Sequence, residues 1–282
     1  MPLAIRAIPQ AALSLAMDWA AHEGWNPGLQ DDVAFHNADP NGFLMAFDGE
    51  DPFGSISAVA YSDTFGFVGL FIVKPGYRGH DIGPQLGQAA LTYLGSRNVG
   101  IDGVEKKVKN YEHYGFTMAY HNIRFEGLSR GAAPINPHVV TVAQLPSWDA
   151  LCTYDRQCFP APRSTFLKSW VSLNGATALA YIDSSQRIQG YGVIRACRQG
   201  YKVGPLFADH PDVAAALLQA LESAIPQQSQ IYLDVPECHS DAVRMVTARS
   251  FTSIFSTARM YNRGIPALTM NKIFGVTTFE LG

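Results

Sequence analysis

The chain has 282 residues, of which 47% are hydrophobic and 16% are charged, with a formal net charge of −3. This composition excludes a disordered chain, and a slight negative charge without a basic block argues against nucleic acid as a partner. No run of 18 apolar residues occurs, and residues 1–20 lack a signal-peptide pattern, so we expect no membrane partner. The four cysteines are scattered, which fits neither a metal site nor a disulfide framework and predicts a reduced, cytoplasmic protein.

The first half of the chain alternates between patterns typical of strands and of helices. A turn-rich loop at 23–28 surrounds Trp25, and Gly115 is expected as a left-handed helix cap. We expect strands at 3–8, 43–47, 56–61, 68–73, 99–104 and 116–125, a hairpin turn at 48–54, and helices at 11–23, at 31–37, through 86–94, and at 106–114.

The second half repeats this order after a linker of glycine and proline at 127–137. We expect helices at 148–158, 164–171 and 211–224, and strands at 178–182, 190–198, 203–208, 231–235 and 251–261. The period of about 135 residues is too long for a solenoid and predicts an internal duplication with domains at 1–128 and 137–282. The alternative is a chance similarity between two α/β segments.

The segment after the strand at 68–73 has the features of an anion site. Arg78, Gly79, Asp81 and Gly83 follow a turn, and Pro84 fits the first turn of the next helix. Free backbone N–H groups at a helix start, glycines that permit close approach and a charged donor predict a pyrophosphate cradle. The alternative is an ordinary strand–turn–helix crossover. Neither the Walker A loop nor the dinucleotide fingerprint is present, and the second half lacks an equivalent cradle.

This segment resembles the acetyl-CoA-binding segment of the GNAT acetyltransferase superfamily, through Val73, Pro75, Tyr77, Arg78, Gly79, Ile82 and Gly83. A second signature of that superfamily is matched by Tyr111-Glu-His-Tyr-Gly-Phe116, and further motifs resemble a two-domain subfamily with a divergent second domain. The resemblance implies an α/β fold of tandem GNAT-like domains, each a mostly antiparallel mixed sheet with a central splayed parallel strand pair flanked by helices. It also implies binding of acetyl-CoA, or another short acyl-CoA, by Phe71, Ile72, Val73, Arg78, Gly79, His80, Asp81, Ile82, Gly83 and Pro84. Asp81 departs from the family, which usually has glycine there, but aspartate tolerates a left-handed backbone.

In the family, the tyrosine of the second signature protonates the departing thiolate, which makes Tyr111 the expected general acid. A phenol with a pKa of about 10 suits a thiolate leaving group. The alternative is that Tyr111 has only a packing role in its helix. Tyr114, three residues later, would then be the candidate general acid. The helix also departs from the family pattern at Val104 and Lys107.

Asp102 and Glu23 are the candidate bases for the acceptor amine. Asp102 has the stronger case because Asp234 recurs at the equivalent place in the second half, although both aspartates could be structural anchors. The loop residues Glu23, Trp25 and Asn26 are expected to line the acceptor pocket, where an aromatic ring beside an acid binds a cation, unless Trp25 fills the core.

These features favour an N-acetyltransferase that acts on a small primary amine by direct attack in a ternary complex, as a monomer or homodimer. One alternative is acetylation of a protein N-terminus or lysine. Another is a non-catalytic acyl-CoA-binding module, motivated by Asp81 and the altered helix. The sequence does not identify the acceptor.

Overall fold

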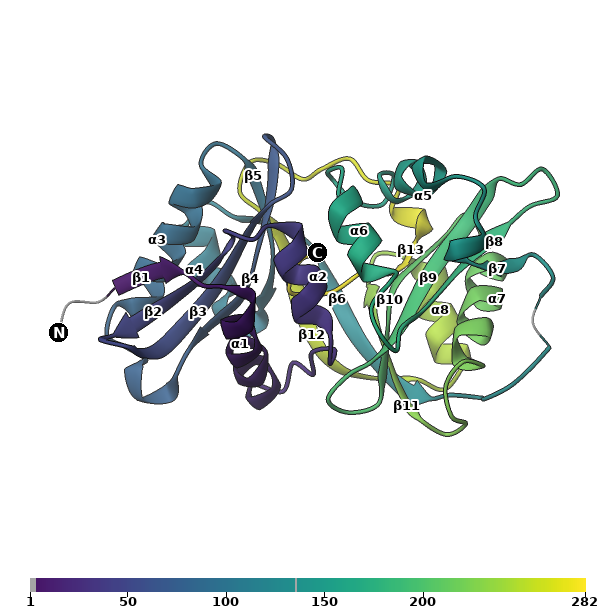
Figure 1. Cartoon of the computed structure of the whole chain (residues 1–282), viewed down its shortest axis with the longest axis horizontal. Helices are drawn as coiled ribbons and strands as arrows, with labels where there is room; N and C mark the ends of the chain where they lie inside the picture. The colour runs from purple at the N-terminus through teal and green to yellow at the C-terminus, as the bar shows by residue number, and fades with distance from the viewer. Residues whose placement is uncertain (1–3, 135) are drawn as a thin grey trace.

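A computed structural model describes residues 4–134 and 136–282 of the chain (Figure 1). Residue 3 of the first expected strand and residue 135 of the expected linker lie outside this range. The first half contains β1 (Ala4–Ala7), α1 (Gln10–His22), α2 (Asp31–Ala38), β2 (Phe43–Asp48), β3 (Asp51–Ala60), β4 (Phe65–Val73), α3 (Ile82–Leu94), β5 (Asn98–Val104), α4 (Val108–His113) and β6 (Thr117–Leu128).

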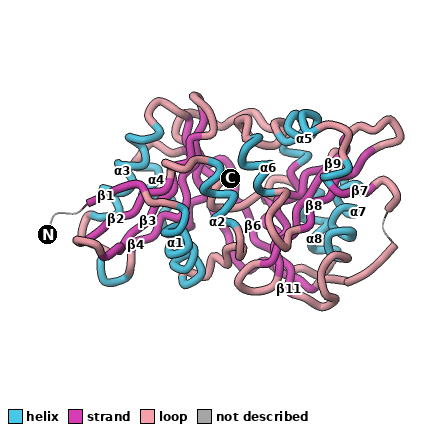
Figure 2. Tube along the Cα trace, viewed as in Figure 1, coloured by secondary structure: helices cyan, strands magenta, loops and turns pink. Residues whose placement is uncertain are grey.

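The second half contains β7 (Val139–Thr141), α5 (Trp148–Asp155), α6 (Ser164–Trp170), β8 (Thr177–Ile182), β9 (Ile188–Ala196), β10 (Tyr201–Ala208), α7 (Pro211–Glu222), β11 (Gln230–Pro236), α8 (Ser240–Ala248), β12 (Thr252–Tyr261) and β13 (Ile273–Gly275). Helices flank the strands in both halves (Figure 2). The expected elements are therefore confirmed in type and order, while β7, α8 and β13 were not expected. The hairpin turn at 48–54 is shorter than expected because β3 already begins at Asp51, and the expected helix at 106–114 starts as a 3-10 turn over Glu105–Lys107.

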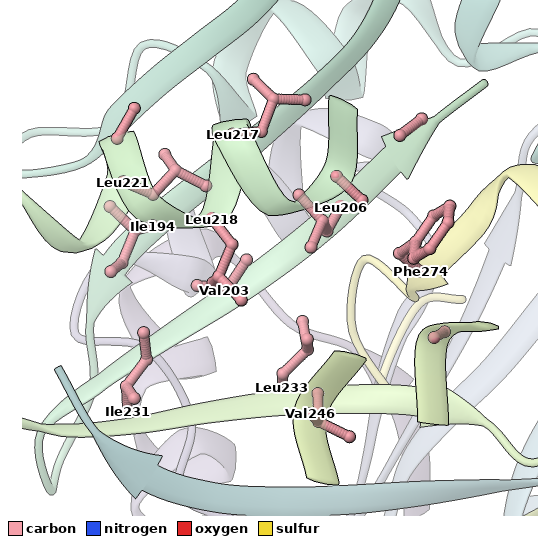
Figure 3. Close-up of a cluster of buried hydrophobic side chains, with 14 of the residues drawn as sticks. Ile194, Val203, Leu206, Leu217, Leu218, Leu221, Ile231, Leu233, Val246 and Phe274 are labelled. Carbon is pink, nitrogen blue, oxygen red and sulfur yellow. The ribbon is translucent and has the colours of Figure 1, made fainter. Parts of the chain in front are cut away.

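The helices pack through apolar stripes with the spacing of a helix face. In α3, the buried residues Ile82, Leu86, Ala90 and Leu94 are four positions apart and lie against the first half of the sheet. In the second half, Leu217, Leu218 and Leu221 of α7 pack on residues of β9, β10 and β11, and Val246 and Phe274 close the same cluster (Figure 3). Each half therefore has a hydrophobic cluster built mostly from its own residues.

The two halves share one mixed sheet because their last strands are exchanged. The strand order is β1-β2-β3-β4-β5-β12-β6-β11-β10-β9-β8-β7, with β13 beside β10. Strand β12 from the second half pairs with β5, and β6 from the first half pairs with β11. Accordingly Ala258 and Met260 belong to the first core and Phe125 to the second. Neither half of the chain completes its own sheet.

Two aspartate–arginine pairs hold the exchanged strands at equivalent positions. Asp102 on β5 stands directly opposite Arg259 on β12, with nitrogen–oxygen distances of 2.6 and 2.9 Å. Asp234 on β11 stands directly opposite Arg124 on β6, at 2.7 and 2.8 Å. Burial alone would raise the pKa of Asp234, but Arg124 holds that pKa below its ordinary value. The recurring aspartates therefore each bind an arginine of the other half.

The last residues of the sequence, 276–282, lie between the two halves, where Figure 1 marks the end of the chain. Most of this final segment is buried, including Thr278 and Leu281. Its backbone is fixed by hydrogen bonds from Tyr61 Oη to the Leu281 carbonyl (3.1 Å) and from Arg163 to the Gly282 carbonyl (3.3 Å). The final segment is therefore part of the packing between the halves.

Candidate active site

Strands β4 and β5 separate halfway along their length. They pair in parallel from Phe65 opposite Asn98 to Val68 opposite Ile101, and the pairing then stops although both strands continue. On its other side, β4 has a bulge at Leu70–Phe71, and Leu70 takes a positive φ of 45°. The splayed parallel pair that the family resemblance implies is thus confirmed.

A cavity of about 630 Å³ opens at this point and is large enough for a bound small molecule. Residues 69–71 of β4 and 102–104 of β5 line its middle. Arg78, Gly79, Asp81 and Gly83 of the loop before α3 line it as well, and so do residues of the second half, including Phe255 and Phe279. The cavity therefore extends from the expected cofactor loop to the junction of the two halves.

The loop before α3 has the conformation that a phosphate cradle needs. Gly79 has φ 87°, and Asp81 adopts the left-handed region at φ 62° and ψ 12°, directly before the first helical residue. The Asp81 side chain makes no capping bond, so it does not occupy the free N–H groups at the start of α3. The aspartate that departs from the family pattern therefore keeps the loop shape that a glycine would give.

Arg78 and Glu23 form an ion pair at the rim of the cavity, and the Arg78 Nε also donates to the Val73 carbonyl at 2.7 Å. Arg78 was expected at the cofactor and Glu23 at the acceptor, so the structure joins two residues with different expected roles. The pair places the Glu23 carboxylate at the cofactor loop.

The other expected cofactor residues divide into two groups. Phe71, Val73, Gly83 and Pro84 line the cavity together with Arg78, Gly79 and Asp81. The side chains of Ile72 and Ile82 instead pack in the hydrophobic core, and His80 is exposed outside the cavity lining. Strand alternation and the helix stripe turn both isoleucine side chains inward, so any contact of Ile72 and Ile82 with the cofactor is left to their backbone groups.

Tyr111 is half-buried against β5 and lines the cavity. Its ring lies so close to Gly103 that a Cβ there would come within 2.5 Å of Cε2, so the strand needs glycine at this position. Burial raises the pKa of Tyr111 to about 12, which keeps the phenol protonated at neutral pH. Tyr114 also lines the cavity but is 43% exposed. Gly115 has φ 84°, which confirms the expected left-handed cap.

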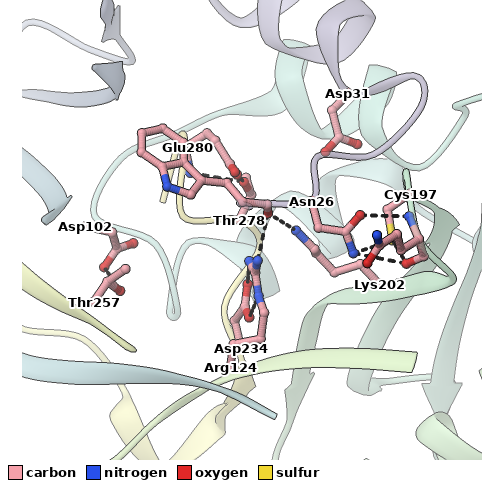
Figure 4. Close-up of polar contacts among 12 residues, drawn as sticks. Asn26, Asp31, Asp102, Arg124, Cys197, Lys202, Asp234, Thr257, Thr278 and Glu280 are labelled. Atoms are coloured by element: carbon pink, nitrogen blue, oxygen red, sulfur yellow. Dashed lines mark hydrogen bonds and ion pairs between the residues drawn. The ribbon is translucent and has the colours of Figure 1, made fainter. Parts of the chain in front are cut away.

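Asp102 lines the cavity wall, but its carboxylate is fully engaged. Besides Arg259, it accepts a hydrogen bond from Thr257 (3.4 Å, Figure 4) and one from Asn122 (2.8 Å), and its side chain is buried. A carboxylate bound this way is poorly placed to take a proton from an amine. These contacts favour the alternative that Asp102 is a structural anchor.

Trp25 lines the cavity, whereas Asn26 faces the second half. The Asn26 amide donates to the Gln199 carbonyl at 3.0 Å and to Cys197 Sγ at 3.3 Å, and its oxygen accepts from the Gln199 N–H at 2.9 Å (Figure 4). Asn26 thus fixes its loop to the turn between β9 and β10. It does not line the cavity, contrary to expectation. The Trp25 carbonyl in turn accepts from Arg124 at 2.7 Å.

Four lining residues from the second half were not expected: Phe255, Thr257, Phe279 and Glu280. They reach the cavity because β12 lies beside β5 and because the final segment crosses β4 at Gly69. No motif or spacing marks these residues in the sequence, since their position depends on the exchange of strands.

In the described part of the chain, no helix is long and apolar enough to cross a membrane. Over the same residues, no group of three or more histidine, cysteine, aspartate or glutamate side chains is arranged to hold a metal ion.

Comparison with known proteins agrees with this geometry. A model of the acetyltransferase (GNAT) family matches residues 10–116, and a model of the acetyltransferase (GNAT) domain matches residues 151–275. The holothin acyltransferase of Pseudoalteromonas sp. strain SANK 73390 is 30% identical over 267 residues, which cover 94% of this chain and 90% of that protein.

Solved structures share the fold at lower identity. A crystal structure from Pyrococcus horikoshii matches with a TM-score of 0.84 at 20% identity, covering 99% of this chain and 96% of the other. A tandem GNAT protein from the clavulanic acid biosynthesis pathway has a TM-score of 0.62 at 13% identity, covering 92% of this chain and 98% of the other. The chain belongs to the GNAT acetyltransferase family and carries two GNAT domains in tandem.

Proposed function

We propose that the protein is an acyl-CoA-dependent N-acyltransferase that transfers an acetyl or another short acyl group to the primary amine of a small molecule. The observation that carries the proposal is the cavity between the splayed strands β4 and β5, with the phosphate-cradle loop at one end and protonated Tyr111 on its wall. Acyl-CoA supplies the activated thioester as donor substrate.

In this proposal, different residues of the first half bind the donor, stabilise the oxyanion and transfer the proton. The N–H groups at the start of α3 and Arg78 bind the pyrophosphate. The bulge at Leu70–Phe71 interrupts the regular hydrogen bonding between β4 and β3. A backbone N–H of β4 at the bulge donates a hydrogen bond that stabilises the oxyanion formed from the attacked carbonyl. Tyr111 gives its phenolic proton to the departing thiolate, while amine and donor are held together in a ternary complex.

A small acceptor is favoured because the second half contributes to the cavity wall. Phe255 of β12 and Phe279 of the final segment line the cavity, where a protein substrate would need an open groove. The relative named holothin acyltransferase supports acyl transfer as the reaction class without restricting the acyl group to acetyl. The non-catalytic alternative loses its main support because Asp81 preserves the loop conformation.

Calorimetric titration with acetyl-CoA, beside the Arg78→Ala variant, tests the donor site. We expect micromolar binding that is strongly weakened in the variant, followed by CoA thiol release when amines are added to the wild type. Absence of acetyl-CoA binding by the wild type, or binding without turnover on any amine, would overturn the proposal.

A further inference from the structure

Four residues with carboxylate side chains line the cavity. Two of them are held in ion pairs, and a third is exposed to solvent. Asp102 is bound by Arg259, Glu23 is paired with Arg78, and Asp81 is exposed on the cofactor loop. The fourth is Glu280, which is 3% exposed and lies in the final segment. Within residues 4–134 and 136–282, its side chain takes part in no ion pair and accepts a hydrogen bond from the Thr278 hydroxyl.

Glu280 is fixed beside the point where the strands separate. Its backbone carbonyl packs so tightly on Gly69 of β4 that no side chain would fit there, and Gly69 directly precedes the bulge at Leu70. Gly69 and Val73 are four residues apart, about 13 Å along a strand. Glu280 therefore lies beside the point where β4 and β5 separate and away from the expected pyrophosphate loop, next to other lining residues of the second half.

Two buried cations, Arg124 and Lys202, lie close enough to Glu280 for its charge to raise the pKa of each. Arg124 is paired with Asp234 and donates to the Trp25 carbonyl, and Lys202 lies 3.4 Å from the same carbonyl. Neither forms an ion pair with Glu280, as far as the described residues show. A buried carboxylate that forms no ion pair and belongs to a residue lining the cavity is well suited to receive an amine and its proton.

We propose that Glu280 is the catalytic base of the acyl transfer. The amine nitrogen forms a bond to the thioester carbonyl carbon while the carbon–sulfur bond breaks. One N–H proton passes to the Glu280 carboxylate, and the Tyr111 hydroxyl proton passes to the thiolate, so the products are an amide and the free CoA thiol. This inference rests on the proposed function. It means that the second half of the chain supplies a catalytic residue to the site between β4 and β5 of the first half.

The test uses the full chain with acetyl-CoA and hydroxylamine, an amine small enough to enter a restricted acceptor site. Glu280→Gln keeps the size of the side chain and should lower the rate of thiol release about 10²-fold, with the acetyl-CoA dissociation constant within about twofold of wild type. Glu280→Ala should be similarly slow, and added formate should restore at least about a tenth of the lost rate by acting as the missing base. Glu126→Gln, on β6 outside the cavity lining, should match wild type.

Each contrary outcome identifies what has failed. A wild type that binds acetyl-CoA but acylates neither hydroxylamine nor any other amine in a screen overturns the proposed function and the role of Glu280 with it. An active wild type with an equally active Glu280→Gln variant overturns only the role of Glu280. Loss of acetyl-CoA binding in the variants, or no rescue of Glu280→Ala by formate, would show that Glu280 supports the fold and is not a base.

Discussion

At the scale of single residues, the proposed function depends most on the protonated phenol of Tyr111. Replacing Tyr111 by phenylalanine keeps the ring against Gly103 but removes the proton, so kcat should fall about 10²-fold while acetyl-CoA affinity stays unchanged. Because burial raises the pKa of Tyr111 to about 12, its acid form persists as the pH rises through the ordinary tyrosine range. The pH–rate profile should therefore show no loss attributable to Tyr111 below about pH 11.

Tyr114→Phe provides the matched control, since Tyr114 shares the cavity but is more exposed. It should retain near-wild-type kcat. If Tyr111→Phe were fully active and Tyr114→Phe were slow, the acid would be Tyr114.

The ion pair between Glu23 and Arg78 predicts opposite effects for two substitutions. Arg78→Ala should weaken acetyl-CoA binding, because it removes a cation from the loop. Glu23→Gln should strengthen binding about two- to fivefold, because it frees Arg78 from a partly exposed pair of a kind that contributes about 0.2–1 kcal/mol. Calorimetry on both variants at low and high salt measures this difference. An increase in the acceptor KM for Glu23→Gln, with unchanged acetyl-CoA affinity, would instead indicate that Glu23 binds the acceptor.

Spacing in the sequence located the residues that depend on local structure. The loop 78–83 and Tyr111 follow from turn residues and a helix end, which are encoded within a few positions of the residue concerned. The roles expected for Asn26 and Asp102 could not be decided in this way, because their partners Gln199 and Arg259 are more than 150 positions away in the chain.

At the scale of elements, the contact between β5 and α4 sets the position of Tyr111. Gly103→Ala places a methyl group where the Tyr111 ring now lies, so the ring must move away from the cavity wall. A displacement of about 1 Å can lower kcat by up to about 10²-fold, and we expect a loss of 10- to 10²-fold with little change in acetyl-CoA affinity. Steady-state kinetics on Gly103→Ala checks this.

Gly76→Ala is a suitable control, because no atom lies within 4 Å of the position of its Cβ. In a Tyr111→Phe background, Gly103→Ala should add little further loss, since the proton donor is already gone. Additive losses in the double variant would mean that Gly103 acts on something other than Tyr111.

Element prediction succeeded where the apolar pattern was long and failed where it was short. Helix α3 presents four buried positions in one stripe and was expected, whereas α8 buries only Ala242 and Val246 and was not. The three-residue strands β7 and β13 are too short to show alternation and are defined by their neighbours in the sheet.

At the scale of the whole molecule, the sequence indicated the duplication but could not indicate the exchange of strands. The segments around Arg124 and Arg259 are alike, and both Asp102 and Asp234 need an arginine opposite, so either pairing satisfies the same side chains. Only the three-dimensional course of the chain decides that β12 lies beside β5. The position of the final segment beside the cavity follows from the same arrangement, and no motif in the sequence indicates it.

The exchange predicts that the two halves depend on each other for folding. We propose that 1–128 and 137–282 are the two domains along the chain, yet 1–128 alone lacks Ala258 and Met260 in its core, and its β6 loses both neighbouring strands. Each half expressed alone should therefore aggregate or pair with a second copy, because an open strand edge with apolar side chains recruits another strand. Co-expressed halves should instead form a one-to-one complex that binds acetyl-CoA, as measured by light scattering and calorimetry. A monomeric 1–128 fragment that unfolds cooperatively and binds acetyl-CoA would show that the exchanged strand is dispensable for the first core.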